Sequence, residues 1–360
     1  MSISLGIRIF FQQRFLLERW DFFGAKVMSA LMLEKLPPAP DDCTDWPWTV
    51  ESDAVSGPRP DGSDWPQISI VMPSFNQGQF IEEAIRSILL QGYPNLELIV
   101  IDGGSTDDTV TILQRYAPWL AYWVSEPDRG QADAINKGLA LARGEIFQFI
   151  NSDDVLVKDV LRKVGCLSDA ADAFAGPVQD FGNASAKKSS NQNLNIKCLI
   201  KYGGISPLCE FHQPGVFLKT SKVKAIGGYD ESFRYVFDYK FMIEYLDRFP
   251  IVHWSYSTMV MFRLHPNSKT VHENSQFEAE FMRARLELAQ SALSKSARRY
   301  LKVTVEKLAW PAKIAKFREK NPRKLPMLCF LVRSCLTSPR VTWSRMTLGA
   351  IRRELIGISV

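Results

Sequence analysis

Apolar and polar residues alternate along the middle of the chain in the way expected for strands followed by helices. Four apolar runs, each about the length of one strand, are separated by segments whose apolar residues recur at helical spacing. Continuous apolar strands that alternate with helices are typical of a mostly parallel sheet with both faces covered. The predicted strands span residues 68–72, 96–101, 120–124 and 145–150, and the predicted helices between them span 78–90, 109–116 and 131–142.

Three of these strands run directly into a polar cluster. The clusters are Pro73–Asn76, Asp102–Asp108 and Asn151–Asp154, after the first, second and fourth strands. Open parallel sheets bind their ligands in the crevice beyond the carboxyl ends of the strands. Because all three clusters lie at that edge of the predicted sheet, we expect a polar binding site there.

The rest of the chain continues the alternation less regularly. A covering helix at 157–167 is followed by a polar stretch, 176–195, which we interpret as a loop or an irregular hairpin. Strands are then expected at 212–218 and 251–263, and helices at 221–226, 237–249 and 277–295. Beyond them, proline residues should break the basic tail into separate helices, at Pro311, Pro322, Pro326 and Pro339.

The residues before the first strand show no such alternation. Residues 1–36 are rich in Phe, Leu and Ile, but charged side chains interrupt them before any run reaches the roughly 18 apolar residues of a membrane span. This pattern favours an amphipathic helix on the core or on a membrane surface over a cleaved signal peptide. Residues 37–66, rich in Pro and Asp, predict an irregular linker held to the domain surface by Trp46, Trp48 and Trp65.

The charge of the chain is unevenly distributed. The net charge is +5, from 44 Lys and Arg against 39 Asp and Glu. Residues 291–360 hold 16 of the basic and 3 of the acidic residues, which leaves 28 and 36 for residues 1–290. Basic helices with apolar residues between the cations are typical of membrane-surface binding. A self-packed, solvated extension is the alternative, and nucleic acid is not expected because no nucleic-acid motif is present.

The cysteine pattern indicates neither a zinc site nor a disulfide framework. Hydrophobic content of 46% and charged content of 23% are those of an ordinary globular protein. Cysteines at positions 43, 166, 198, 209, 329 and 335 show neither CxxC spacing nor a Cys/His cluster. Free thiols in a reducing compartment are the simpler interpretation.

The acidic residues at the strand ends each admit two interpretations. Asn151–Asp154 is either the cap of the next helix or a source of carboxylates for Mg²⁺ or Mn²⁺, which need only one or two of them beside phosphate oxygens. Asp102–Asp107 is either a turn or a glycine-lined loop in which Asp102 accepts a hydrogen bond from a base or ribose. Neither GxGxxG nor GxxxxGK[ST] occurs here, so a dinucleotide site and a P-loop are unsupported.

Asp238 lies among aromatic residues at a predicted helix start. On sequence alone it is either a helix cap or a general base. The four histidines share no spacing, and each is expected to be packed or on the surface; they are His212, His253, His265 and His272.

Taken together, residues 68–156 resemble the family 2 glycosyltransferases, which use nucleotide-sugar donors on a GT-A fold. The resemblance depends on the order and spacing of ISIVMPSFNQGQF, ELIVIDGGSTDDT, EPDRGQADAINKG and GEIFQFINSDDVL, and it resumes at 212–249. It implies an α/β fold with a Rossmann-like, mostly parallel central sheet flanked by helices, with helical N- and C-terminal extensions. The implied parts are an N-terminal extension at 1–36, a linker at 37–66, a glycosyltransferase domain at 67–265 with a nucleotide-binding half at 67–156 and an acceptor-binding half at 157–265, and a basic helical extension at 266–360.

The resemblance assigns donor-binding roles to the strand-end residues. Asp102 would bind the uracil or ribose, and Phe75 would lie against the base ring. The segment 128–133 would approach the ribose and the diphosphate. The implied donor-binding residues are Pro73, Phe75, Asn76, Asp102, Arg129 and Gln131.

The resemblance also implies a metal ligand and a catalytic base. The family's DxD motif falls on residues 151–153, but its first position is Asn151 here. A divalent cation, Mg²⁺ or Mn²⁺, is therefore expected at Asp153, with Asp154 in support. The catalytic base falls on Asp238, although Lys240 replaces the family's usual second acid.

The implied reaction is a direct displacement with inversion. Asp238 would deprotonate an acceptor hydroxyl, which attacks the anomeric carbon while the cation neutralises the departing diphosphate. The donor is expected to be a UDP-sugar carrying a hexose or N-acetylhexosamine, and the acceptor a glycan or lipid-linked sugar of cell-surface polysaccharide synthesis. The expected location is cytoplasmic, with peripheral attachment to an anionic inner membrane face through residues 291–360.

Two other functions fit parts of the sequence. A nucleotidyltransferase would share the sheet and the metal carboxylates, but it needs a basic, glycine-rich loop, and PSFNQGQF contains neither Lys nor Arg. A catalytically inactive sugar- or lipid-binding scaffold of the same fold is favoured by Asn151 and Lys240. Hydrolysis of nucleotide sugars that depends on a divalent ion would separate these functions from glycosyl transfer.

Overall fold

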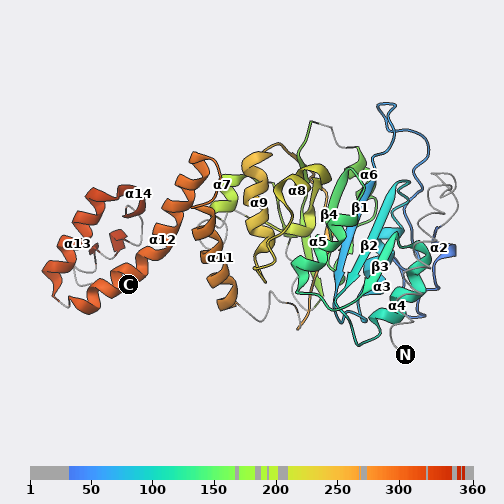
Figure 1. The fold of residues 1–360 in the computed structure, drawn as a ribbon, viewed down its shortest axis with the longest axis horizontal. Coiled ribbons are helices and arrows are strands. Elements are labelled where there is room, and N and C mark those ends of the chain that lie inside the picture. Colours follow the sequence, from blue (N-terminus) through green and yellow to red (C-terminus); the bar gives the residue numbers. More distant parts are fainter. Residues whose placement is uncertain are drawn as a thin grey trace.

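The strands predicted between residues 68 and 150 and at 212–218 join one sheet of seven strands in the computed structural model (Figure 1). The strand predicted at 251–263 is divided between this sheet and a smaller one, and the strand at 173–175 was not predicted. The structure describes residues 32–166, 170–182, 188–192, 194–201, 210–266, 268, 274–321, 323–342, 347–349 and 351–352. In spatial order the strands are β10 (Val252–Trp254), β6 (Ala173–Ala175), β9 (Val216–Lys219), β4 (Ile146–Phe149), β1 (Ile68–Ser74), β2 (Leu96–Asp102) and β3 (Tyr122–Ser125). Only β9 runs antiparallel to its neighbours, β4 and β6. The expected mostly parallel α/β sheet is therefore confirmed.

Helices cover both faces of this sheet, and a smaller sheet lies beside it. The helices around the sheet are α3 (Ile81–Leu89), α4 (Thr109–Tyr116), α5 (Gln131–Leu141), α6 (Val160–Gly165), α7 (Ile196–Lys201), α8 (Thr220–Ile226) and α9 (Phe237–Arg248). Two short 3₁₀ turns are η1 (Ala117–Trp119) and η2 (Gln213–Gly215). The smaller sheet has the order β5 (Val155–Leu156), β11 (Val260–Leu264), β7 (Val178–Gly182) and β8 (Lys188–Ser189).

The side chains of the central strands alternate between two hydrophobic clusters. Ile70 and Met72 of β1 are buried with residues of α3, α4 and α6, whereas Val71 is buried against α5 and the α9 side of the sheet. Successive residues of a strand point to opposite faces, so an apolar residue at every position is required when both faces are covered. This explains why the central strands are continuously apolar.

Strand β1 extends past Met72 and includes Pro73 and Ser74. Pairing between β1 and β4 ends at Val71, whereas pairing with β2 continues to Ser74. The carbonyl of Val71 accepts from Ile150 on the β4 side, and that of Ser74 accepts from Gly103 on the β2 side. Pro73 shares the orientation of Val71, so its missing N–H falls where β4 has already ended and no ladder bond is lost.

The sequence-predicted boundaries differ from the structure mainly where proline or a turn intervenes. Strand β3 begins at Tyr122 instead of residue 120, because the turn η1, which contains Pro118, precedes it. The polar stretch 176–195 contains an irregular hairpin, β7 and β8. The expected N-terminal helix lies outside the described residues except at its end, where α2 spans Met32–Lys35.

Residues 37–66 contain no helix or strand, and a buried arginine fixes them to the sheet layer. The guanidinium of Arg86 donates to the carbonyls of Pro37, Pro47 and Trp48, at 2.7–3.1 Å. It also donates to the hydroxyl of Tyr116. Burial raises the pKa of Tyr116 to about 12, so this hydroxyl stays protonated at neutral pH.

The C-terminal helices extend away from the sheet along the long axis of the molecule (Figure 1). They are α11 (Asn274–Leu288), α12 (Lys295–Lys320), α13 (Lys324–Thr337) and α14 (Pro339–Thr342). The prediction that proline breaks the tail is wrong at Pro311, which lies inside α12. Trp310 and Ile314 on either side of it are packed in one core with α13, and this packing offsets the lost hydrogen bond. Pro322 lies outside the described residues.

Among the described residues, every helix is too short or too polar to cross a bilayer.

We predict that Arg86→Ala lowers the free energy of unfolding by about 3 kcal/mol, because three carbonyls, one buried and two partly buried, lose their donor. Chemical denaturation measures this change. Arg115→Ala is the control, since Arg115 is half exposed and pairs only at the surface with Glu82, and it should change stability by less than about 0.5 kcal/mol. Equal effects of the two substitutions would contradict the anchoring role of Arg86.

Candidate active site

Side-chain hydrogen bonds join the loops that follow β1 and β2. Asn76, which has a positive φ of 52°, donates its N–H to Ser105 Oγ and accepts from the N–H of Thr106 with its side-chain oxygen. Gly78 donates its N–H to Asp107 Oδ2 at 2.8 Å. The two loops therefore form one surface at the carboxyl edge of the sheet, as the sequence predicted.

Asp102 is the buried centre of this surface. Its Oδ2 accepts from the N–H of Ser105 and the hydroxyl of Ser125, at 2.8 and 2.6 Å, and its Oδ1 accepts from the hydroxyl of Ser105 at 2.5 Å. The residue is fully buried. For Asp102 to accept a hydrogen bond directly from a ligand, as the resemblance implies, one of these internal bonds would have to be given up.

Pro73 and Phe75 differ in their exposure at this edge. Pro73 is buried within β1, whereas the Phe75 side chain is 59% exposed. An aromatic ring that is left in solvent at a strand end offers a face on which a planar base can stack. Phe75 is therefore the accessible aromatic residue of this loop.

The loop after β4 contains a buried carboxyl group, Asp154. Its Oδ1 accepts from the N–H of Arg263 at 3.1 Å and its Oδ2 from the side-chain amide of Asn151 at 3.2 Å. Complete burial, followed by the charge of neighbouring Asp153, raises the pKa of Asp154 well above its usual range. Asp154 therefore joins β11 to the loop and holds Asp153 in place.

Asp153 is the carboxylate of this loop that faces outward, and it meets a histidine. Its Oδ2 lies 3.1 Å from His265 Nε2, and the two side chains are 19% and 9% exposed. Among the described residues, no three His, Cys, Asp or Glu side chains gather closely enough to hold a metal ion by themselves. One carboxylate beside one imidazole is nevertheless enough where phosphate oxygens complete the coordination.

Sequence reasoning missed His265 because it is 112 residues from Asp153 and shares no spacing with another ligand. The signal that points to it is its position directly after a predicted strand, now β11. Arg263 of the same strand was also missed, and it donates to the backbone carbonyl of Asp153.

Arg129 and Gln131 lie just before and at the start of α5, which contacts the loop after β4. The guanidinium of Arg129 pairs with Asp133 and Glu231, at 2.8 and 2.6 Å. The hydrogen bond that Arg129 donates to Asp133 raises the pKa of Arg129 above its usual value. Gln131 donates to the side-chain oxygen of Asn151 at 2.6 Å, so the start of α5 is tied to the strand-end loop.

A cleft of about 770 Å³ begins at Gln131 and Asn151 and continues over the start of α9 to α11 and α12. Its wall is strongly aromatic. The aromatic side chains are Phe149, Phe211, Tyr235, Phe237, Tyr239, Phe262, Phe277 and Phe281. One cavity therefore runs from the start of α5 and the loop after β4 to Asp238, which also lines it.

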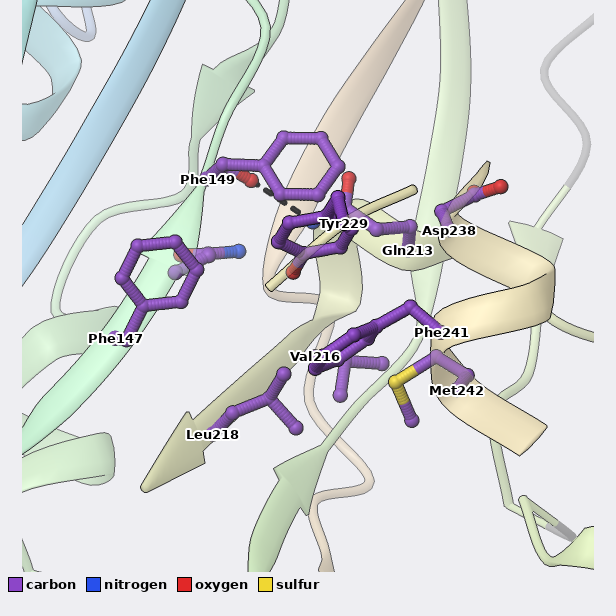
Figure 2. A pocket seen from close by; sticks show the side chains of 10 residues that line it. Phe147, Phe149, Gln213, Val216, Leu218, Tyr229, Asp238, Phe241 and Met242 are labelled. Carbon is purple, nitrogen blue, oxygen red and sulfur yellow. Dashed lines mark hydrogen bonds between the residues drawn. The ribbon is translucent and has the colours of Figure 1, made fainter. Parts of the chain in front are cut away.

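Asp238 is the second residue of α9, in its first turn. Figure 2 shows its carboxylate turned away from the apolar side chains of Phe241 and Met242. Behind it lies Tyr229, whose pKa is raised well above its usual value by burial and then by the charge of Asp238. No side chain caps this helix at Val236, so Asp238 is not the N-cap.

The segment before Asp238 is held by a carboxylate from α11. Glu280 accepts backbone hydrogen bonds from Arg234, Tyr235 and Val236, at 2.8–3.2 Å. Nothing in the spacing of the sequence indicated this contact, since about 45 residues separate the partners. Lys240, where the family has a second acid, pairs instead with Asp230 and Glu244.

Comparison with known proteins gives one family and one fold. The family model for Glycosyl transferase family 2 matches residues 69–206. An uncharacterised glycosyltransferase of Mycobacterium tuberculosis is 32% identical over 189 residues, which are 49% of this chain and 68% of that protein.

Two solved structures have a similar fold. Residues 1–349 of S. aureus TarS, in complex with UDP-GlcNAc, match with a TM-score of 0.55 and 15% identity, over 80% of this chain and 81% of that one. The mannosyltransferase PcManGT from Pyrobaculum calidifontis, in complex with GDP-Man and Mn²⁺, matches with a TM-score of 0.52 and 18% identity, over 86% and 92%. In another TarS structure the match covers 81% of this chain and 53% of the TarS chain. The expected GT-A sheet is thus confirmed.

We predict that Glu280→Ala loosens the start of α9. The amide hydrogens of residues 234, 235 and 236 lose their acceptor, so their exchange with solvent should become about tenfold faster or more. Hydrogen exchange with mass spectrometry measures the effect. Glu278→Ala, which removes an exposed carboxylate two residues earlier on α11, should leave this exchange unchanged. Unchanged exchange in both variants would show that residues 234–236 keep their conformation without Glu280.

Proposed function

Because the chain belongs to glycosyl transferase family 2 and is a glycosyltransferase, we propose that it moves a sugar from a nucleotide-diphosphate sugar to an acceptor hydroxyl with inversion. The observation that supports this most strongly is the shared cleft. Its wall includes Gln131 at the start of α5, Asn151 after β4 and Asp238 at the start of α9. Donor and acceptor would therefore meet between them.

The donor would lie across the joined loops at the carboxyl edge of the sheet. Phe75 would stack on the base. Asp102 would act indirectly, by fixing the loop that contacts the base, or directly, by accepting a hydrogen bond from the donor in place of one of its internal bonds. The other donor-binding residues would be Pro73, Asn76, Arg129 and Gln131. UDP-sugar is our first candidate, because the similar structure of TarS holds UDP-GlcNAc; that of PcManGT holds GDP-Man.

A divalent cation, Mg²⁺ or Mn²⁺, fits the residues at the end of β4. Asp153 offers a partly exposed carboxylate, and His265 offers an imidazole nitrogen on a buried side chain. Asp154 would support them from below by holding the loop. When bound, such an ion neutralises negative charge on the leaving diphosphate. Hard cations of this kind need few protein ligands when phosphate oxygens are present.

Asp238 would act as the general base. Its carboxylate would take the proton of the acceptor hydroxyl as the new bond to the anomeric carbon forms and the bond to the diphosphate oxygen breaks. Asp238 lies in the first turn of α9, and Glu280 holds the backbone that leads into that turn. Because the displacement is direct, no covalent enzyme intermediate is required.

The aromatic wall of the cleft supports an acceptor with apolar surface. Aromatic faces pack against the carbon faces of sugar rings and against hydrocarbon chains. A glycan or lipid-linked sugar of cell-surface polysaccharide synthesis fits such a wall. We propose that transfer takes place on the cytoplasmic side, where nucleotide sugars are made, at or near the inner membrane face.

We predict that Asp153→Ala abolishes cation-dependent binding of the nucleotide diphosphate and lowers transfer by at least about a hundredfold. His265→Ala should weaken binding in the same direction. Calorimetric titration with UDP and Mn²⁺ measures both. Asp64→Ala removes an exposed carboxylate far from the site along the chain and is the control. Near-normal turnover in Asp153→Ala would refute the metal assignment.

We predict that Asp238→Asn keeps donor affinity but lowers kcat by about two to four orders of magnitude, the usual contribution of a general base. The amide retains the shape and can still accept from the N–H of Tyr239, as the carboxylate does at 2.7 Å. Glu244→Gln, on the same helix, should leave kcat within about twofold. Loss of donor affinity together with turnover would instead make Asp238 a structural residue.

A further inference from the structure

Helix α13 is apolar on two opposite faces, and only one of them is covered. Met327 and Leu331, four residues apart, are buried in a small core with Trp310 and Ile314 of α12. Phe330 stacks on Phe317 of α12 with ring centroids 4.2 Å apart. These contacts fix the orientation of α13, so its opposite face is a defined surface.

The uncovered face is a stripe along the whole helix. Leu325, Cys329, Val332 and Leu336 recur at intervals of four, three and four residues, which places them on one side of a helix. Leu325 and Leu336 are 71% and 78% exposed, and Val332 is 47% exposed. Soluble surfaces rarely present such a continuous aliphatic row, so it marks a contact.

The exposed charge of the C-terminal helices that carry this stripe is mostly positive. Arg333 is next to Val332 in sequence and three residues before Leu336, so it borders the stripe. Among the described residues from 313 onwards, the exposed charged side chains are basic except Glu319. They are Lys313, Lys316, Arg318, Lys320, Arg323, Arg333, Arg340 and Arg352.

We propose that the exposed stripe of α13, with Arg333 at its border, forms a docking surface for an anionic lipid bilayer, helped by the positive charge of the neighbouring C-terminal helices. An interfacial helix inserts its apolar row to the level of the acyl chains while its cations remain at the headgroups. A second copy of the chain fits less well, because a symmetric contact would bring the same cations together. Nucleic acid would match the charge but not the leucines. The inference is independent of the donor and the acceptor.

Helix α13 lies at the end of the molecule away from the sheet, with α12 between it and the sheet (Figure 1). The cleft reaches Leu308 of the same helix α12. Helix α12 therefore links the docking helix α13 to the end of the cleft.

The test is co-sedimentation of the full chain with vesicles of equal parts phosphatidylcholine and phosphatidylglycerol, and with vesicles of phosphatidylcholine alone, at low and raised salt. We expect binding to the anionic vesicles that weakens with salt. The double variant Leu325→Gln with Leu336→Gln should bind at least about tenfold more weakly. Both side chains are exposed, so thermal unfolding should be unchanged, and this is measured alongside.

The matched control is Ile251→Gln with Tyr256→Gln, which removes two exposed apolar side chains, 57% and 80% exposed, outside the C-terminal helices. It should bind as the unchanged chain does. Arg333→Glu with Arg340→Glu should also lose about tenfold or more. Binding unaffected by loss of the leucines would mean that charge alone attracts the chain and would overturn the proposal. Absence of binding at low salt would overturn the proposal too. So would a dimer of the unchanged chain in sedimentation velocity that is monomeric in the leucine variant.

Discussion

The candidate site depends on one buried carboxylate, that of Asp102. Its oxygens accept hydrogen bonds from residues of its own loop and from Ser125 at the end of β3, while Ser105 passes the connection on to Asn76 after β1. Three strand ends are thereby held at fixed positions along one edge. A buried anion is costly unless such donors surround it, so the loops can adopt this arrangement only together. The polar surface offered to a nucleotide is a consequence of that constraint.

The other half of the site depends on contacts between distant segments. Asp154 and Arg263 bind the loop after β4 to β11, which brings His265 to Asp153. Glu280 of α11 holds the backbone before Asp238. Residues of α11 and α12 also line the cleft, so the C-terminal helices that follow residue 266 contribute to the site as well as extending from the fold.

The sequence predicted most of the sheet because both of its faces are buried and every central position is apolar. It also predicted that the polar clusters lie at one edge, since parallel strands end together. It did not predict His265, Arg263 or Glu280, because their partners are far away in sequence and a single polar residue has no periodicity. The break expected at Pro311 did not occur, because packing of Trp310 and Ile314 outweighs the local preference of proline. The local sequence pattern therefore predicted the sheet and the polar side chains at its strand ends. Tertiary contacts decided which other side chains meet them.

The central claim is that the joined strand ends bind a nucleotide diphosphate together with a divalent ion. Hydrogen exchange of the full chain with UDP, and separately with GDP, in the presence of Mn²⁺ or of a chelator, tests it most directly. One of the nucleotides should protect the amides of residues 75–78, 103–106 and 151–153, and the chelator should abolish protection at the last of these segments. Protection elsewhere, no protection with either nucleotide, or protection at 151–153 that is indifferent to the metal would contradict the account.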